Sequence, residues 1–124
     1  MSDHNAVELE VAVLHALVGE EAAVVAGLLS TYLNTLGQSA PQLICALAMR
    51  DSHGVCRAAH VMKSPSLCVG ALLLGQLCGA LEEAARAADW PRLDAVAPSF
   101  EPVLARTIRA VKLHIDVARR QVPA

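Results

Sequence analysis

Apolar residues recur along this chain at intervals of three and four, the spacing that places them on one face of an α-helix. The first such stretch covers residues 7–18 and ends at Gly19, a residue type that commonly terminates helices. A second stretch covers about residues 20–48, although Gly37 and Pro41 interrupt it. The pattern predicts a short first helix, followed by one long helix kinked near Pro41 or by two helices nearly in line.

The next stretch carries its own start and stop signals. Asp51 and Ser52 are suitable N-cap residues for a helix that begins after them. Pro65 lacks a backbone donor and crowds the preceding turn. We therefore expect this helix to bend or end between Pro65 and Leu67, with Gly70 in the turn that follows.

Two further helical stretches are predicted in the second half of the chain. Residues 71–88 carry an apolar stripe, made of Leu74, Leu77, Cys78, Leu81, Ala85 and Ala88. On the solvated face of this helix, Glu82 and Arg86 have the spacing of a surface ion pair. The final stretch keeps one helical phase through Pro98 and Pro102, which predicts either one long kinked helix or two stacked pieces that share a face.

Four main helices with short connections predict an all-α fold. The expected architecture is an antiparallel up-down-up-down four-helix bundle with a short additional N-terminal helix packed on it. The 124 residues are enough for one core, and no repeat or linker divides them, so we expect residues 1–124 to form a single domain. Hydrophobic residues make up 55% of the chain but aromatic residues only 2%, which favours a helical core of Leu, Val, Ala, Ile and Met.

Composition excludes several functions. A net charge of −2, with one Trp, one Tyr and one Phe, argues against nucleic-acid binding, which requires basic surface and often stacking platforms. No apolar run approaches the ~18 residues of a membrane span, and the acidic N-terminus differs from a basic signal peptide. We expect a soluble cytoplasmic protein without direct membrane insertion.

The four cysteines have no C-x-x-C spacing and lie among apolar residues: Cys45, Cys56, Cys68 and Cys78. A zinc or redox site would need paired ligands that converge on one point. We interpret the cysteines as small hydrophobic residues in or near a reduced core, and we predict no metal site in this chain.

Candidate chemistry is concentrated on one face of the third predicted helix. At about 100° per residue, seven residues lie within roughly 60° of His60, namely His53, Cys56, Arg57, His60 itself, Lys63, Ser64 and Leu67. Five of these seven are polar, whereas the opposite side is mostly apolar. His60 is therefore predicted to face solvent, with Val55 and Met62 in the core.

These side chains suit phosphoryl transfer. A neutral imidazole is a good nucleophile near pH 7, and Lys63, one turn after His60, can place a positive charge beside phosphoryl oxygens. Ser64 leaves room for a partner and can add a hydrogen bond. The sequence shows no second group to act as an obligate base, no carboxylate cluster for Mg²⁺ and no glycine-rich nucleotide motif. A phosphoryl carrier of this kind would depend on its partner for the metal ion.

The stretches "AAHVMKS" and "VGALLLGQLCGALEEAARAADW" resemble the histidine phosphotransfer (HPt) domains of bacterial multistep phosphorelays. The residues that fall on the family pattern are His60, Met62, Lys63, Ser64, Gly70, Ala71, Leu74, Leu77, Cys78, Leu81 and Glu82. Weaker similarity covers nearly the whole chain. The sequence departs from the pattern at Ser64, where glycine is frequent, and at Pro65.

The resemblance implies that His60 accepts a phosphoryl group from an aspartyl phosphate of one receiver domain and passes it to the aspartate of another. Lys63 would stabilise the phosphoryl group. The residues expected to meet the partner are Arg57, Ser64, Leu67 and Gly70. The implied partners are response-regulator receiver domains, which would supply Mg²⁺, and the chain itself would need no cofactor. Such a protein is a phosphoryl carrier rather than a stand-alone enzyme, either free or as the C-terminal domain of a hybrid sensor histidine kinase on the cytoplasmic side of the membrane.

Two alternatives remain open at this point. The chain could be a docking or regulatory module that binds a receiver, or another signalling protein, through the same face without phosphate turnover. It could also be a helical bundle in which His60 is an ordinary surface residue. The presence of both His60 and Lys63 favours the carrier.

Overall fold

The computed structural model describes residues 8–122, and helices make up most of them. Their bounds in chain order are α1 Val11–Val18, α2 Ala22–Ala48, α3 Ser52–Val69, α4 Leu72–Arg86, α5 Trp90–Val96, the 3₁₀ turn η2 Ala97–Ser99 and α6 Phe100–Arg120. No strand is present within this described part of the chain. The predicted all-α fold is confirmed.

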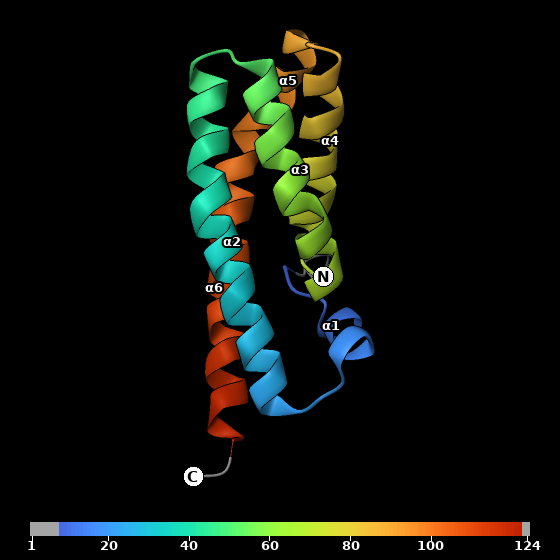
Figure 1. Cartoon of the computed structure of the whole chain (residues 1–124), viewed down its shortest axis with the longest axis vertical. Coiled ribbons are helices and arrows are strands. Elements are labelled where there is room, and N and C mark those ends of the chain that lie inside the picture. Colours follow the sequence, from blue (N-terminus) through green and yellow to red (C-terminus); the bar gives the residue numbers. More distant parts are fainter. Residues whose placement is uncertain (1–7, 123–124) are drawn as a thin grey trace, which may run out of the picture.

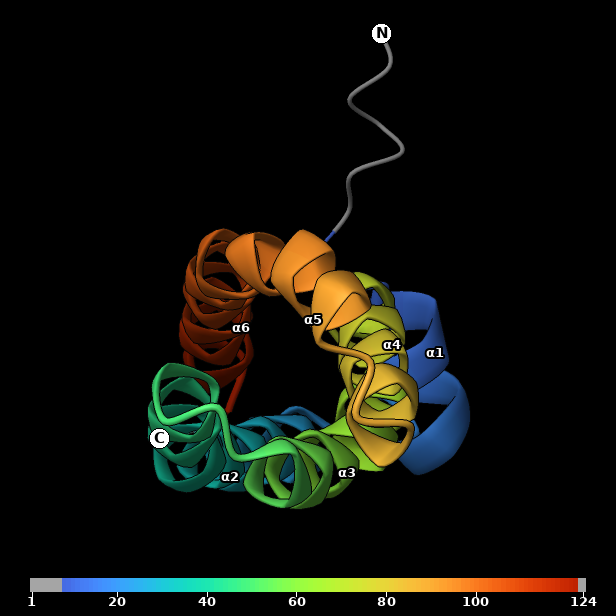
Figure 2. The same ribbon diagram turned by 90° about the horizontal axis from the view of Figure 1, so that it is seen from above.

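Helices α2, α3, α4 and α6 form the bundle, and each packs against its neighbours around a central core (Figures 1 and 2). Seen from above, α5 lies across one end of the bundle, between α4 and α6 (Figure 2). The short α1 lies at the opposite end and contacts α3 and α2 (Figure 1). This arrangement is the predicted four-helix bundle with an additional N-terminal helix.

The core is built mainly from aliphatic side chains, as the composition predicts, with Phe100 and Tyr32 as its buried aromatic residues. Its largest fully buried members are Phe100, Leu14, Leu29, Leu36, Leu43, Met62, Leu74, Leu81, Leu93, Val25, Val55 and Val69. These residues come from every α-helix of the chain. Val55 and Met62 have no exposed surface, which confirms their predicted orientation and fixes the rotation of α3 about its axis.

The prolines in the second and in the last predicted helical stretch affect their helices differently. Pro41 lies within α2, which is one continuous helix, so the alternative of two separate helices is wrong. At the other end of the chain, α5 and α6 are separate helices joined by η2, and Pro98 lies in that turn. Pro102 belongs to the first turn of α6, where a missing N–H costs no helical hydrogen bond.

The expected end of α3 near Pro65 is wrong, because the helix continues to Val69. Pro65 leaves the carbonyl of Val61 without its helical donor. Because Val61 is 49% exposed, water can hydrogen-bond to this carbonyl instead. On the opposite side, Ser66 and Val69 are buried, and the Ser66 hydroxyl is 2.6 Å from the Tyr32 hydroxyl of α2. Packing against α2 stabilises the helix beyond the proline.

Gly70 ends α3. Its φ of 92° lies in the left-handed region, and the Ala71 amide donates to the Ser66 carbonyl at 2.8 Å, as in a Schellman motif. The Glu10 amide donates to the Gly70 carbonyl at 2.7 Å, which ties the segment before α1 to this turn. A Cβ at position 70 would lie 2.2 Å from the Glu10 carbonyl oxygen.

Gly70→Ala is expected to lower the free energy of unfolding by at least about 1–2 kcal/mol, since it combines a left-handed backbone with a backbone clash. Gly37→Ala is the matched control, because a Cβ there meets open space in the middle of α2. That change should raise stability by about 0.5–1 kcal/mol. Urea denaturation measures both variants, and equal effects would contradict the role given to Gly70.

Several smaller expectations are corrected. The first helix begins at Val11, and Val7 lies outside the described residues. Leu17, an apolar residue at helical spacing from Leu14, is nevertheless 55% exposed because few elements cover α1. All four cysteines are free, but only Cys78 is buried, whereas Cys45 and Cys68 are exposed on outer helix faces.

Within residues 8–122 no single helix is both long and apolar enough to cross a membrane. Helices α1 and α2 meet that test only when taken together, and the chain bends by 112° between them.

Candidate functional site

His60 lies in the middle of α3, and its side chain is 68% exposed, as predicted. The helix that carries it starts at a well-formed N-cap, where the Asp51 carboxylate accepts a hydrogen bond from the Gly54 amide at 3.1 Å. Buried residues on the other side of α3 anchor it to α2. The backbone beneath His60 is therefore held in place by packing.

Two glycines of α4 face side chains of α3. A Cβ at Gly75 would lie 2.5 Å from a Leu67 methyl group, so Leu67 covers this glycine. One turn further along α4, a Cβ at Gly79 would be 3.4 Å from the Lys63 side-chain carbon Cδ. The stem of Lys63 thus lies against α4, and its amino group is directed along that helix.

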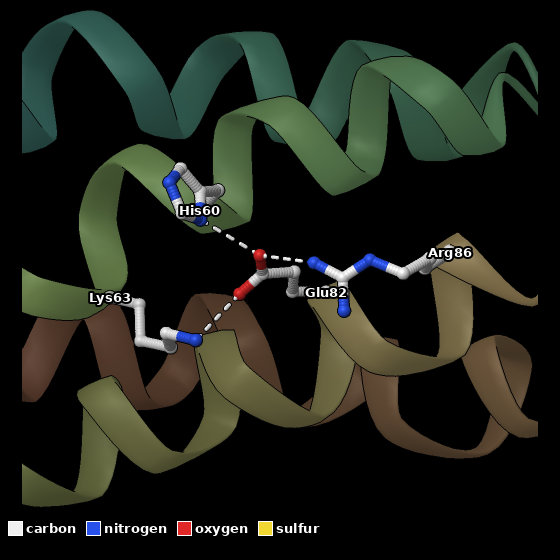
Figure 3. Close-up of polar contacts among 4 residues, drawn as sticks. All are labelled: His60, Lys63, Glu82 and Arg86. Carbon is white, nitrogen blue, oxygen red and sulfur yellow. Dashed lines mark hydrogen bonds and ion pairs between the residues drawn. The ribbon is translucent and has the colours of Figure 1, made fainter.

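The next turn of α4 carries Glu82, which contacts both predicted catalytic residues (Figure 3). Glu82 Oε2 is 2.8 Å from His60 Nδ1, and Glu82 Oε1 is 2.9 Å from Lys63 Nζ in an ion pair. Arg86 donates from a terminal guanidinium nitrogen to Oε2, also at 2.8 Å. His60, Lys63, Glu82 and Arg86 form a single cluster of polar groups, which we call the His60 cluster.

The placement of Glu82 corrects the sequence-based interpretation. The predicted pair with Arg86 is present, but Glu82 is only 3% exposed and does not lie on a solvated face. The sequence-based interpretation also did not place Glu82 beside His60. A signal was available in the sequence, because Glu82 lies one turn from Cys78 and from Ala85 and so falls within the apolar stripe of α4.

Glu82 is ionised in this environment. Burial acts to raise the pKa of its carboxyl group, but Lys63 and His60 beside the carboxylate outweigh burial, and the pKa is lowered. An ionised carboxylate only accepts hydrogen bonds, so His60 Nδ1 must be the donor. In the neutral imidazole this leaves the lone pair on Nε2, the nitrogen that points away from Glu82.

The residues predicted to bind a partner do not all lie on the surface. Arg57 and Ser64 are exposed on α3 on either side of His60, and Leu67 is 37% exposed. Gly70 is buried beneath Glu10, so the expectation that it meets the partner is wrong. Its role is to end α3. Arg57 also lines a groove of about 600 Å³ between α2 and α3, together with Met49 and Val61.

The described residues contain no group of three or more His, Cys, Asp or Glu side chains arranged to hold a metal ion. The polar chemistry of the His60 cluster comes from one carboxylate, two cations and an imidazole. Such a set can hold and orient a nucleophile and attract an anionic group.

Fold and site together define a helical bundle that presents an exposed histidine beside a lysine and a buried carboxylate. The Hpt domain family matches residues 27–120 of the chain. The chain therefore belongs to the Hpt domain family and has a phosphotransfer role in phosphorelay signalling.

A solved structure supports this assignment. The crystal structure of histidine-containing phosphotransfer protein B (HptB) from Pseudomonas aeruginosa PAO1 is similar to this chain, with a TM-score of 0.79 and 28% sequence identity. The similarity covers 90% of this chain and 96% of that chain. No curated protein matches by sequence.

Proposed function

We propose that this protein accepts a phosphoryl group on His60 Nε2 from the aspartyl phosphate of one receiver domain and delivers it to the aspartate of another. The observation that carries the proposal is the hydrogen bond between His60 Nδ1 and the buried Glu82 carboxylate. It places the lone pair on Nε2, and the high exposure of the imidazole makes that nitrogen accessible to a partner.

The reaction needs no base on this chain. In the first step, the Nε2 lone pair forms a bond to phosphorus while the bond from phosphorus to the aspartate oxygen breaks, and the aspartate leaves as a carboxylate. The product is a phosphorylated imidazolium that keeps its proton on Nδ1 and donates a hydrogen bond from it to the Glu82 carboxylate. The second step reverses these changes toward the next aspartate. Mg²⁺ is expected on the receiver domain.

Lys63 has two roles in this proposal. Its ion pair with Glu82 fixes the carboxylate, and its amino group, on a side chain that is 35% exposed, lies close enough to the imidazole to attract phosphoryl oxygens. The neutral, exposed Ser64 leaves space on the same face for the partner.

Lys63→Ala is expected to slow phosphoryl transfer by about tenfold or more, because a positive charge beside the transferred group is lost. The domain should remain folded, because Lys63 contributes to no part of the buried core. Rates are measured by rapid mixing with a phosphorylated receiver, and circular dichroism reports folding. Lys112→Ala on α6 is the matched control, and an equal effect of both changes would contradict a local role for Lys63.

The surface beside His60 suits a protein partner. The groove between α2 and α3 is lined mostly by apolar side chains, with Arg57 and Asp51 as its charged residues. Met49 is 74% exposed and Val61 is 49% exposed. A receiver domain that brings its acidic centre to His60 would cover this region. The same surface also suits the alternative function, a docking module without phosphate turnover.

A two-receiver experiment separates the two functions. A receiver carrying radioactive aspartyl phosphate is mixed with the protein, and a second, unlabelled receiver is then added. The carrier function predicts an acid-labile, base-stable label on the protein that moves to the second receiver. A docking module predicts a complex with the receiver but no label on this chain.

A further inference from the structure

The His60 cluster contains more positive charge than its one carboxylate requires. Lys63 lies 2.9 Å from Glu82 Oε1, and Arg86 lies 2.8 Å from Oε2 (Figure 3). These two permanent cations more than compensate the single negative charge of Glu82. A second proton on His60 is therefore not needed to neutralise the buried carboxylate.

This charge count bears on the form of His60 that can react. A lone carboxylate beside an imidazole favours the imidazolium, which carries a proton on both nitrogens and has no lone pair for phosphorus. Arg86 shares Oε2 with His60 Nδ1, so its charge lies close to the ring and opposes the second proton.

The surroundings contain few other charges. Glu82 of α4 contacts the imidazole, and Lys63 of α3 and Arg86 of α4 contact Glu82. Arg57, one turn before His60 on α3, is exposed. Helix α2, which packs against the other side of α3, has no Asp, Glu, Lys, Arg or His between Ala22 and Ala48. The only ionisable residue of α1 between Val11 and Val18 is His15, on a helix that packs at the far end of the bundle.

We propose that Arg86 is a positioning residue that acts through Glu82 to keep His60 neutral, with its lone pair on Nε2. The importance of this for phosphoryl transfer rests on the proposed function, whereas the protonation of His60 is a property of the unphosphorylated protein. Arg86 is 64% exposed, and an exposed pair at this spacing contributes little to stability. Removal of Arg86 is therefore expected to change the protonation of His60 and not the stability of the fold.

The test is a nuclear magnetic resonance measurement of the His60 ring nitrogens near pH 7 in ¹⁵N-labelled, unphosphorylated protein. Arg86→Gln should raise the ratio of imidazolium to neutral imidazole about fourfold, as expected for losing a nearby charge in a water-like dielectric. Arg86→Lys should restore most of the wild-type ratio. Arg92→Gln is the control, since it removes an exposed arginine from a weaker ion pair with Glu83, 3.7 Å apart.

Agreement with all three expectations supports the proposal. An unchanged or lowered ratio in Arg86→Gln overturns it, as does an equal change in Arg92→Gln or a lack of rescue by lysine. Because no receiver or phosphate is present, failure of this test leaves the two-receiver experiment to decide the proposed function separately. Failure of phosphoryl transfer, conversely, would not alter the measured ratio.

Discussion

A phosphorylated receiver is expected to label the wild-type protein and to leave His60→Gln without label, a complete loss of transfer. Glutamine has no nucleophilic nitrogen, because its amide lone pair is delocalised into the carbonyl group. Its amide N–H can still donate to Glu82, so the carboxylate keeps a hydrogen-bonding partner. The variant should therefore keep the helical circular dichroism of the wild type.

The matched control is His53→Gln, which changes an exposed histidine two turns earlier on the same helix. It should be labelled at the wild-type rate. If label persists in His60→Gln and is stable in acid, it is not phosphohistidine. The phosphoryl group would then lie on a residue other than His60. Loss of label in both variants would point to damage to the surface rather than to loss of the acceptor.

Glu82→Leu is expected to slow labelling by about 10- to 100-fold, the range found when a partner that orients a functional histidine is removed. Without the carboxylate, the Nδ1 proton has no fixed acceptor and the lone pair is no longer confined to Nε2. The Nδ1–H group of the phosphorylated imidazolium also loses its hydrogen-bond acceptor. Glu82→Gln, which keeps a hydrogen-bond acceptor without the charge, should fall between wild type and Glu82→Leu in rapid-mixing assays.

The fold should tolerate the loss of Glu82. The carboxylate is buried, but His60, Lys63 and Arg86 all retain exposed surface and can be solvated once it is gone. Because the folded pKa of Glu82 is lowered, its ionisation stabilises the wild type above the unfolded pKa, and this stabilisation disappears as pH falls through the folded pKa. Urea denaturation in that acidic range should show a smaller pH dependence for Glu82→Leu. If Glu82→Leu is labelled at the wild-type rate, the role given to the carboxylate in phosphoryl transfer is wrong.

The positions of the helices and the orientation of His60 could be predicted because both depend on local spacing. Residues three and four apart share a face, so the polar run around His60 and the apolar positions Val55 and Met62 had to lie on opposite sides of α3. The bundle followed from four such amphipathic stretches with short connections.

The failures have a common cause in long-range packing. Glu82 was assigned to a solvated face because its spacing from Arg86 is typical of a surface pair, whereas its burial depends on α3, which lies against that face. Pro65 predicts a bend or an end of α3, because a proline disfavours helix locally, yet α3 continues to Val69. The buried Ser66 and Val69, packed against α2, outweigh that preference.

The sequence by itself determined the all-α bundle, the exposed histidine and the lysine one turn after it, since helical periodicity is a property of the chain's own spacing. Only the tertiary structure decided which nitrogen of His60 is free. That choice depends on a hydrogen bond to Glu82, 22 residues away on another helix. Helices α3 and α4 approach each other closely at Gly75, and a carboxylate that can only accept hydrogen bonds then fixes the imidazole.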